Sequence, residues 1–160
     1  MSTQRKTLIG LVGTGAAALL MSYVPQFEGT ILRGYKDPIG IVTACTGHTA
    51  TAVLGRPYTK QECDNLLQDD LIKHAEPVLL CTPSIRNKPY VLASAISFAF
   101  NVGTSAYCRS TMAQLFNAGR YVEGCAQLDR WVWAGTQKLP GLVKRRQVER
   151  AMCEGKLWIE

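Results

Sequence analysis

The chain has 160 residues and a formal net charge of +6, and 47% of its residues are hydrophobic. This length suits one folded domain and is short for two. No internal repeat or low-complexity linker divides the chain. The positive charge favours a polyanionic partner, such as nucleic acid, anionic lipid or an acidic cell-wall polymer.

An uncharged segment runs from Thr7 to Val24, directly after Arg5 and Lys6. Its eighteen residues approach the roughly 20 that cross a bilayer, but three glycines and three alanines dilute its hydrophobicity. The two cations would hold the N-terminus in the cytoplasm, so the following residues would be exported. We expect residues 1–24 to be a weak, uncleaved membrane anchor, inserted through residues 7–24. A cleaved signal peptide and a buried core helix are the alternatives.

Two acids and a hydroxyl follow in the stretch from Glu28 to His48. Asp37 lies nine residues after Glu28, and Thr43 lies six residues after Asp37. The turn-rich residues 34–40 precede a β-branched run at 41–43, which predicts a strand, a tight turn and a second strand. Such a hairpin would fold Asp37 and Thr43 back toward Glu28. Two carboxylates and a hydroxyl are groups that acid-catalysed glycoside hydrolysis needs.

The remainder of the chain reads as helical. Thr59 and Glu62 form a capping box that begins a helix, which we expect to end at Pro77. Pro89 opens a second helix that is apolar nearly all round and should be buried. Further helices are predicted at about 109–117, at 121–133 closed by Gly135, and from Pro140 to near Gly155. The predicted fold class is α+β, a small β region beside a larger helical lobe with a cleft between them.

The six cysteines are well separated and lack C-x-x-C spacing. This pattern favours three disulfides in an oxidising compartment over a zinc or redox motif, with buried cytosolic thiols as the alternative. Counting alone leaves fifteen connectivities open. From the expected elements we hypothesise the pairs Cys45–Cys63, Cys108–Cys125 and Cys81–Cys153. His74 has no second ligand at metal spacing, so we predict no metal, and no cofactor is expected.

The string G-Y-K-D, followed by I-V-T and G-H, resembles the active-site hairpin of phage lysozymes in glycoside hydrolase family 24, the T-even phage lysozyme relatives. Four later segments are similar to that family in the same order: 59–63, 97–103, 110–111 and 141–153. The resemblance therefore covers residues 25–160, which we expect to form the catalytic domain. The weak anchor resembles that of signal-anchor-release endolysins, in which the segment first tethers the enzyme and later leaves the membrane.

The resemblance implies a lysozyme-like fold and a role for each matching residue. Glu28 would be the general acid, Asp37 would stabilise oxocarbenium character, and Thr43 would position a water molecule for inverting attack. His48 and Asp70 would form a structural pair. Asn101 would contact substrate. Arg145 and Arg146 would bind the peptide carboxylates of murein, lean toward Glu28, or form a solvated face.

These observations together predict a monomeric, exported enzyme that cuts peptidoglycan in the periplasm. While residues 7–24 are in the host inner membrane, Glu28 would lie too close to the bilayer for the cleft to assemble. A disulfide exchange with the anchor is not expected, because the anchor has no cysteine. A membrane-tethered binding or inhibitor module and a lytic transglycosylase are the alternatives. The exported location argues against nucleic-acid binding.

Overall fold

A computed structural model describes residues 5–157, beginning with two helices that meet at Gly13. In α1 (Leu8–Val12) the Thr7 side chain caps the first turn by accepting from the Gly10 amide at 3.0 Å. Gly13 has a φ of 86°, which a side-chain-bearing residue rarely adopts, and it breaks the helical path before α2 (Thr14–Glu28). Within the described residues, no helix is long and apolar enough to cross a membrane.

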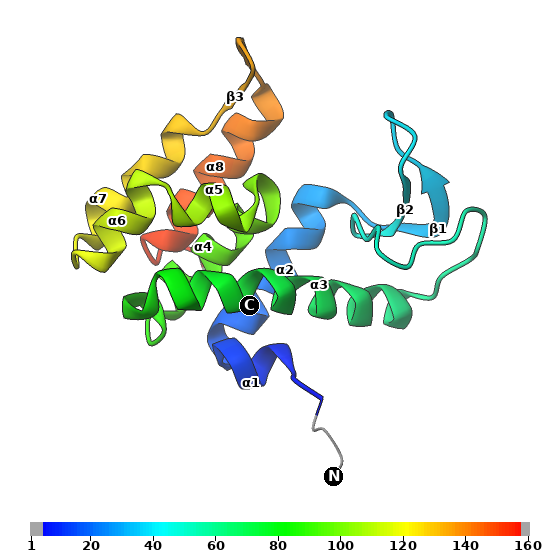
Figure 1. Ribbon diagram of the computed structural model, residues 1–160, viewed down its shortest axis with the longest axis horizontal. Coiled ribbons are helices and arrows are strands. Elements are labelled where there is room, and N and C mark those ends of the chain that lie inside the picture. Colours follow the sequence, from blue (N-terminus) through cyan, green and yellow to red (C-terminus); the bar gives the residue numbers. More distant parts are fainter. Residues whose placement is uncertain (1–4, 158–160) are drawn as a thin grey trace.

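The predicted hairpin is present as β1 (Ile31–Lys36) and β2 (Val42–Cys45), paired antiparallel. The Asp37 amide donates to the Ile41 carbonyl at 2.9 Å and closes the turn. Figure 1 places this hairpin at one end of the molecule, away from most of the helices. The described fold is therefore a small β lobe and a larger helical lobe, the α+β arrangement that the sequence predicts.

The long helix α3 (Lys60–Cys81) connects the two lobes, as Figure 1 shows. Its N-terminus carries the predicted capping box, in which Thr59 and Glu62 satisfy each other's backbone amides. The prediction that Pro77 ends this helix is wrong, because the helix continues to Cys81. Proline within a helix costs about 3 kcal/mol. Burial of Val78 and Leu79 just beyond it offsets that cost, at roughly 1.5–3 kcal/mol each.

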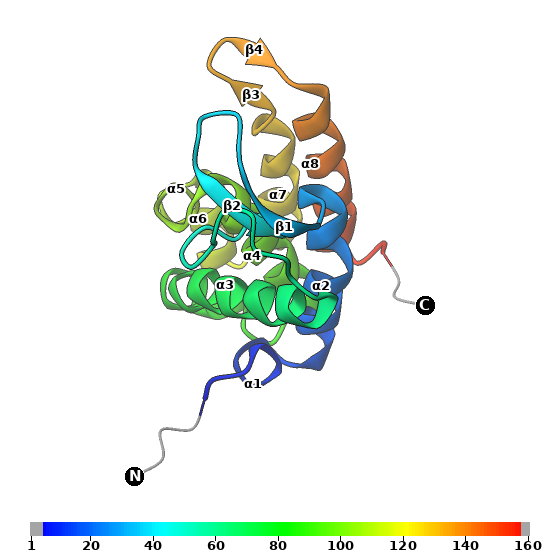
Figure 2. The ribbon, with the colours of Figure 1, turned by 90° about the vertical axis from the view of Figure 1, so that its right-hand side faces the viewer.

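The helical lobe surrounds α4 (Pro89–Val102), whose residues 91–99 are all buried. Two 3₁₀ turns and four further helices pack around it: η1 (Pro83–Ile85), α5 (Thr104–Cys108), α6 (Thr111–Asn117), α7 (Tyr121–Ala126), η2 (Gln127–Arg130) and α8 (Pro140–Cys153). The sequence analysis missed α5, and its helix over 121–133 is too long. A second hairpin, β3 (Trp133–Ala134) and β4 (Gln137–Lys138), projects from the lobe in Figure 2. Gly135, with a φ of 61°, makes its turn instead of closing a helix.

One side of the uncharged N-terminal segment lies in the hydrophobic core of the described fold. Leu8, Ala16, Leu20 and Val24 are at most 1% exposed and belong to the cluster that α3 and α4 also build. The boundary expected between residues 24 and 25 falls inside α2. The same helix therefore carries the apolar segment and ends at Glu28.

Two of the three hypothesised disulfides are wrong. The structure contains Cys45–Cys63, but it joins Cys81 to Cys108 and Cys125 to Cys153, each pair with Cα atoms 5.7 Å apart. The missed helix α5 explains the difference, because it ends at Cys108 and packs against α3, where Cys81 lies. Cys125 on α7 then pairs with Cys153 at the end of α8.

Candidate active site

Glu28 is the last residue of α2 and faces the space between the lobes. Gly29, with a φ of 73°, ends the helix immediately after it. The Glu28 side chain is 25% exposed, and its Oε1 accepts a hydrogen bond from Arg145. The other oxygen, Oε2, lies toward Gly47, where an added Cβ atom would be 3.7 Å away. Arg145 thus holds one carboxylate oxygen and leaves the second available to a ligand.

A buried network formed with Ser97 and Glu149 holds Arg145 in place. Its Nη2 donates to the Ser97 carbonyl at 3.1 Å, and its Nε donates to Glu149 at 3.4 Å. Glu149 is fully buried and also accepts from the Ser97 hydroxyl at 2.6 Å. A buried carboxylate is tolerated only when it is paired and hydrogen-bonded, and this one meets both conditions. The network therefore fixes the cation that orients Glu28.

Arg146 belongs to the same network and is 1% exposed. Its guanidinium donates to Glu149, to the Asn101 Oδ1 and, at 2.9 Å, to the Trp131 carbonyl. Burial lowers the pKa of Arg146, although Glu149 opposes that effect. Both arginines are thus occupied inside the protein, because burial removes them from solvent. Arg145 leans toward Glu28, which was one alternative to binding murein carboxylates. Arg146 does neither, because all of its partners lie inside the protein.

Asp37 and Thr43 lie on the β1–β2 hairpin. The Asp37 carboxylate accepts from the amides of Ile39, at 3.0 Å, and Ile41, at 2.8 Å, which orients it over the turn. Thr43 is 5% exposed and its hydroxyl donates to the Ile41 carbonyl at 3.0 Å. Neither side chain hydrogen-bonds to Glu28 within residues 5–157. The hairpin approaches Glu28 at Gly47, just beyond β2.

A cavity of about 370 Å³ opens beside Glu28. Asn101 lines it, and because its Oδ1 accepts from Arg146, its amide hydrogens remain free to donate to a ligand. The sequence analysis did not place Lys73 or His74 in this wall. The full lining is Glu28, Gly47, Thr49, Ala50, Asp70, Lys73, His74, Phe100 and Asn101.

His48 is 4% exposed and bridges the hairpin to α3. Its Nδ1 lies 2.8 Å from the Asp70 carboxylate, and its Nε2 accepts from the Thr51 amide at 3.2 Å. Because Nε2 is an acceptor, the proton of a neutral ring is on Nδ1 and is donated to Asp70. This geometry suits a structural group, and it fastens the hairpin to α3 beside the Cys45–Cys63 disulfide.

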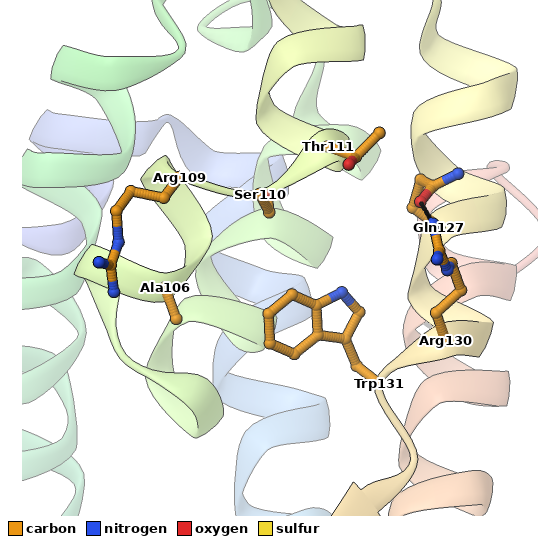
Figure 3. Close-up of a pocket in the computed structure, with 7 residues that line it drawn as sticks. All are labelled: Ala106, Arg109, Ser110, Thr111, Gln127, Arg130 and Trp131. Atoms are coloured by element: carbon orange, nitrogen blue, oxygen red, sulfur yellow. Dashed lines mark hydrogen bonds between the residues drawn. The ribbon is translucent and has the colours of Figure 1, made fainter.

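A second cavity, of about 630 Å³, lies in the helical lobe between α5, the start of α6 and η2. Figure 3 shows the Trp131 indole between Arg109 on one side and Arg130 on the other. Within the described residues neither arginine forms an ion pair; Arg130 donates only to Gln127, at 3.2 Å. Ala106, Ser110 and Thr111 complete the lining.

Comparisons with known proteins agree with this architecture. Residues 25–149 match the family model described as Phage lysozyme. The SAR-endolysins of Enterobacteria phage P21 and Bacteriophage PS119 are 35% and 34% identical over 163 residues, covering 96% of this chain and 95% and 94% of theirs. The muramidase domain of SpmX from Asticaccaulis excentricus has a TM-score of 0.75 at 28% identity, covering 86% of this chain and 94% of that one.

The structure of the active form of P1 phage endolysin Lyz shares the fold, with a TM-score of 0.81 at 20% identity over 96% of this chain and 92% of that one. The family match spans the hairpin, the connecting helix and most of α8. It therefore includes every residue that lines the cavity beside Glu28. The chain belongs to the phage lysozyme family, with SAR-endolysins among its relatives.

Proposed function

We propose that this protein is a phage endolysin that hydrolyses the β-1,4 bond between N-acetylmuramic acid and N-acetylglucosamine in peptidoglycan. The observation that carries the proposal is the position of Glu28. It ends a buried helix, it is oriented through Arg145, and its second oxygen faces a cavity between the lobes. A carboxyl group at this position can reach a glycosidic oxygen bound in the cavity, and as the general acid it would donate its proton there.

In the proposed mechanism Glu28 protonates the leaving oxygen while Asp37 stabilises positive charge on the sugar. Thr43 positions the attacking water on the opposite face, which gives inversion at the anomeric carbon. The two backbone amides that bond to Asp37 support this role because they hold its carboxylate in a fixed orientation over the turn. The free arginines Arg109 and Arg130 suit the carboxylates of the murein stem peptide.

The decisive variant is Glu28→Gln, which keeps the size of the side chain and removes its acid. We expect murein hydrolysis to fall at least 100-fold with an unchanged circular dichroism spectrum. Glu123→Gln is the matched control, since Glu123 is exposed and pairs only with Arg120. Full lytic activity of Glu28→Gln would overturn the role of Glu28 as the acid, whereas a wild-type protein that binds murein without cleaving it would favour a binding or inhibitor module.

The products separate hydrolysis from the closest alternative chemistry. Hydrolysis gives a reducing N-acetylmuramic acid end, whereas a lytic transglycosylase gives an anhydro sugar. Mass spectrometry of digested murein distinguishes these ends, and nuclear magnetic resonance of fresh product identifies the anomer. A retained anomer would reject the inverting role proposed for Thr43.

We further propose that residues 7–24 first tether the enzyme to the inner membrane and then pack into the released periplasmic protein. The burial of Leu8, Leu20 and Val24, and the continuity of α2 from this segment to Glu28, support that sequence of events. In the tethered state Glu28 would lie four residues beyond the membrane segment and could not join the network. Activity on murein is compared between membrane-bound and released fractions; equal rates per molecule would reject this control.

A further inference from the structure

The β lobe carries a disproportionate share of the exposed aliphatic surface. Of the ten large hydrophobic side chains that are exposed in residues 5–157, six belong to residues 31–54: Ile31, Leu32, Ile39, Ile41, Val53 and Leu54. Single exposed aliphatic residues are ordinary, but their concentration on one small lobe is typical of an interaction surface. None of the six lines either cavity described above.

A bulge in β1 brings the backbone around Leu32 beside the loop that carries Val53 and Leu54. The register between β1 and β2 shifts between Ile31 and Tyr35, so the bulged residues bond to the following loop instead. The Tyr58 amide donates to the Leu32 carbonyl at 3.0 Å, and the Gly34 amide donates to the Arg56 carbonyl at 2.9 Å.

Gly34 permits a close approach of that loop, because an added Cβ atom would lie 1.8 Å from the Val53 carbonyl oxygen and 3.2 Å from the Leu54 Cα. Leu32, Val53 and Leu54 therefore lie on neighbouring backbone segments, and each is about half exposed. We call these three residues the apolar edge.

Cations accompany the apolar edge. Arg33 and Lys36 are exposed residues of β1, and within the described part of the chain neither forms an ion pair. Aliphatic side chains beside free cations are the combination that binds an anionic membrane surface, since the first enter the headgroup boundary while the second attract its charge. A purely apolar partner would leave these cations without compensation.

The chain also places this edge close to the N-terminal segment. Leu32 follows Val24 by eight positions, so the chain between them can reach at most about 28 Å when fully extended. We propose that the apolar edge, with Arg33 and Lys36, is a lipid-binding surface for an anionic bilayer. The role of this surface in the cell rests on the proposed tethering, in which the β lobe would lie against the lipid headgroups. Binding of the folded chain to lipid can be measured independently of that tethering.

The experiment measures cosedimentation of the purified full-length protein with vesicles of phosphatidylcholine, with and without phosphatidylglycerol. We expect Leu32→Ser combined with Leu54→Ser to weaken partitioning at least tenfold. Arg33→Gln combined with Lys36→Gln should abolish the preference for phosphatidylglycerol. Leu80→Ser combined with Val122→Ser is the control, because these side chains are 83% and 79% exposed outside the β lobe and should leave binding unchanged.

All variants retain residues 7–24, so a difference between them reports on the apolar edge. Failure of the wild type to bind either vesicle, or equal binding by the Leu32/Leu54 variant, would overturn the inference. Hydrolysis of soluble murein fragments is measured in parallel and should stay within twofold for the Leu32/Leu54 variant. Absent hydrolysis with edge-dependent vesicle binding would reject the proposed function and leave this inference standing.

Discussion

Arg145 and Glu28 form an ion pair although they lie 117 residues apart in the chain. Glu28 ends the second helix and Arg145 lies on the last, so the pair joins the two ends of the described fold. The Phe27 ring packs 4.7 Å from the Arg145 guanidinium carbon and shields the pair. The position of Glu28 thus depends on the docking of α8 against α4.

We expect Arg145→Ala to lower murein hydrolysis about 100-fold per folded molecule, because Glu28 would lose the group that orients it. Glu149 would also lose a partner but would keep Arg146 and Ser97, so we expect the unfolding free energy to fall by about 1.5–3 kcal/mol, the contribution of a hydrogen bond to a charged group. Arg145→Lys should restore only part of the activity and part of the stability, since an ammonium cannot reach the same three partners in one geometry. Lys144→Ala, at the exposed neighbouring position, is the control for kinetics and urea unfolding. Normal activity of Arg145→Ala would contradict the positioning role.

Substitutions of Ser97 and Ser94 test how much the hydrogen bond to the buried Glu149 carboxylate contributes to stability. Ser97 donates to the charged Glu149 side chain at 2.6 Å, whereas Ser94 donates to the neutral Glu149 carbonyl at 2.9 Å. Hydrogen bonds to charged groups contribute more than neutral ones. We expect Ser97→Ala to lower the unfolding free energy by about 2–3 kcal/mol and Ser94→Ala by about 1 kcal/mol. Equal losses in urea titrations would show that the Glu149 side chain is not the critical acceptor.

Leu20→Ala tests whether the N-terminal segment is part of the core of the folded protein. Leu20 is fully buried, so the change leaves a cavity and should cost about 3 kcal/mol. Ile9→Ala is the control, because Ile9 is 57% exposed and should change stability by less than about 0.5 kcal/mol. Thermal unfolding of both purified variants makes the comparison, and a stable Leu20→Ala protein would contradict the packing of α2.

Because Tyr107 is buried, we predict that the protein loses stability at alkaline pH. Burial raises the pKa of Tyr107 well above its ordinary value of 10.0, with an opposing hydrogen bond to Thr82 at 2.8 Å. The folded state therefore keeps its proton above pH 10 while the unfolded state releases it, so stability is complete below pH 10 and falls as pH rises. The slope approaches about 1.4 kcal/mol per pH unit.

Tyr107→Phe should remove this fall while costing about 1 kcal/mol at neutral pH for the lost hydrogen bond. Urea unfolding between pH 8 and pH 11.5 measures both effects. An identical alkaline slope in the variant would assign the loss of stability to other groups.

Much of the β lobe could be predicted from local sequence. The residues around Asp37 specify a turn whatever surrounds them, because its carboxylate bonds to amides only two and four residues ahead. The Thr59 and Glu62 capping box and the helix beginning at Pro89 are equally local, and the structure contains both where they were expected. The prediction that Pro77 ends its helix was wrong because burial of the residues beyond it outweighs the cost of the proline. The prediction at Gly135 was wrong because a glycine can make a hairpin turn as well as end a helix.

The sequence by itself determined the hairpin, the main helices and the acid and hydroxyl groups of the candidate site, because these depend on hydrogen bonds and periodicity within a few residues. Only the tertiary structure decided that Arg145 meets Glu28, that Cys81 pairs with Cys108, and that Leu8 and Leu20 lie in the core. Each of these contacts depends on how helices dock. Docking is set by the packing of the whole apolar core, which no short stretch of sequence contains.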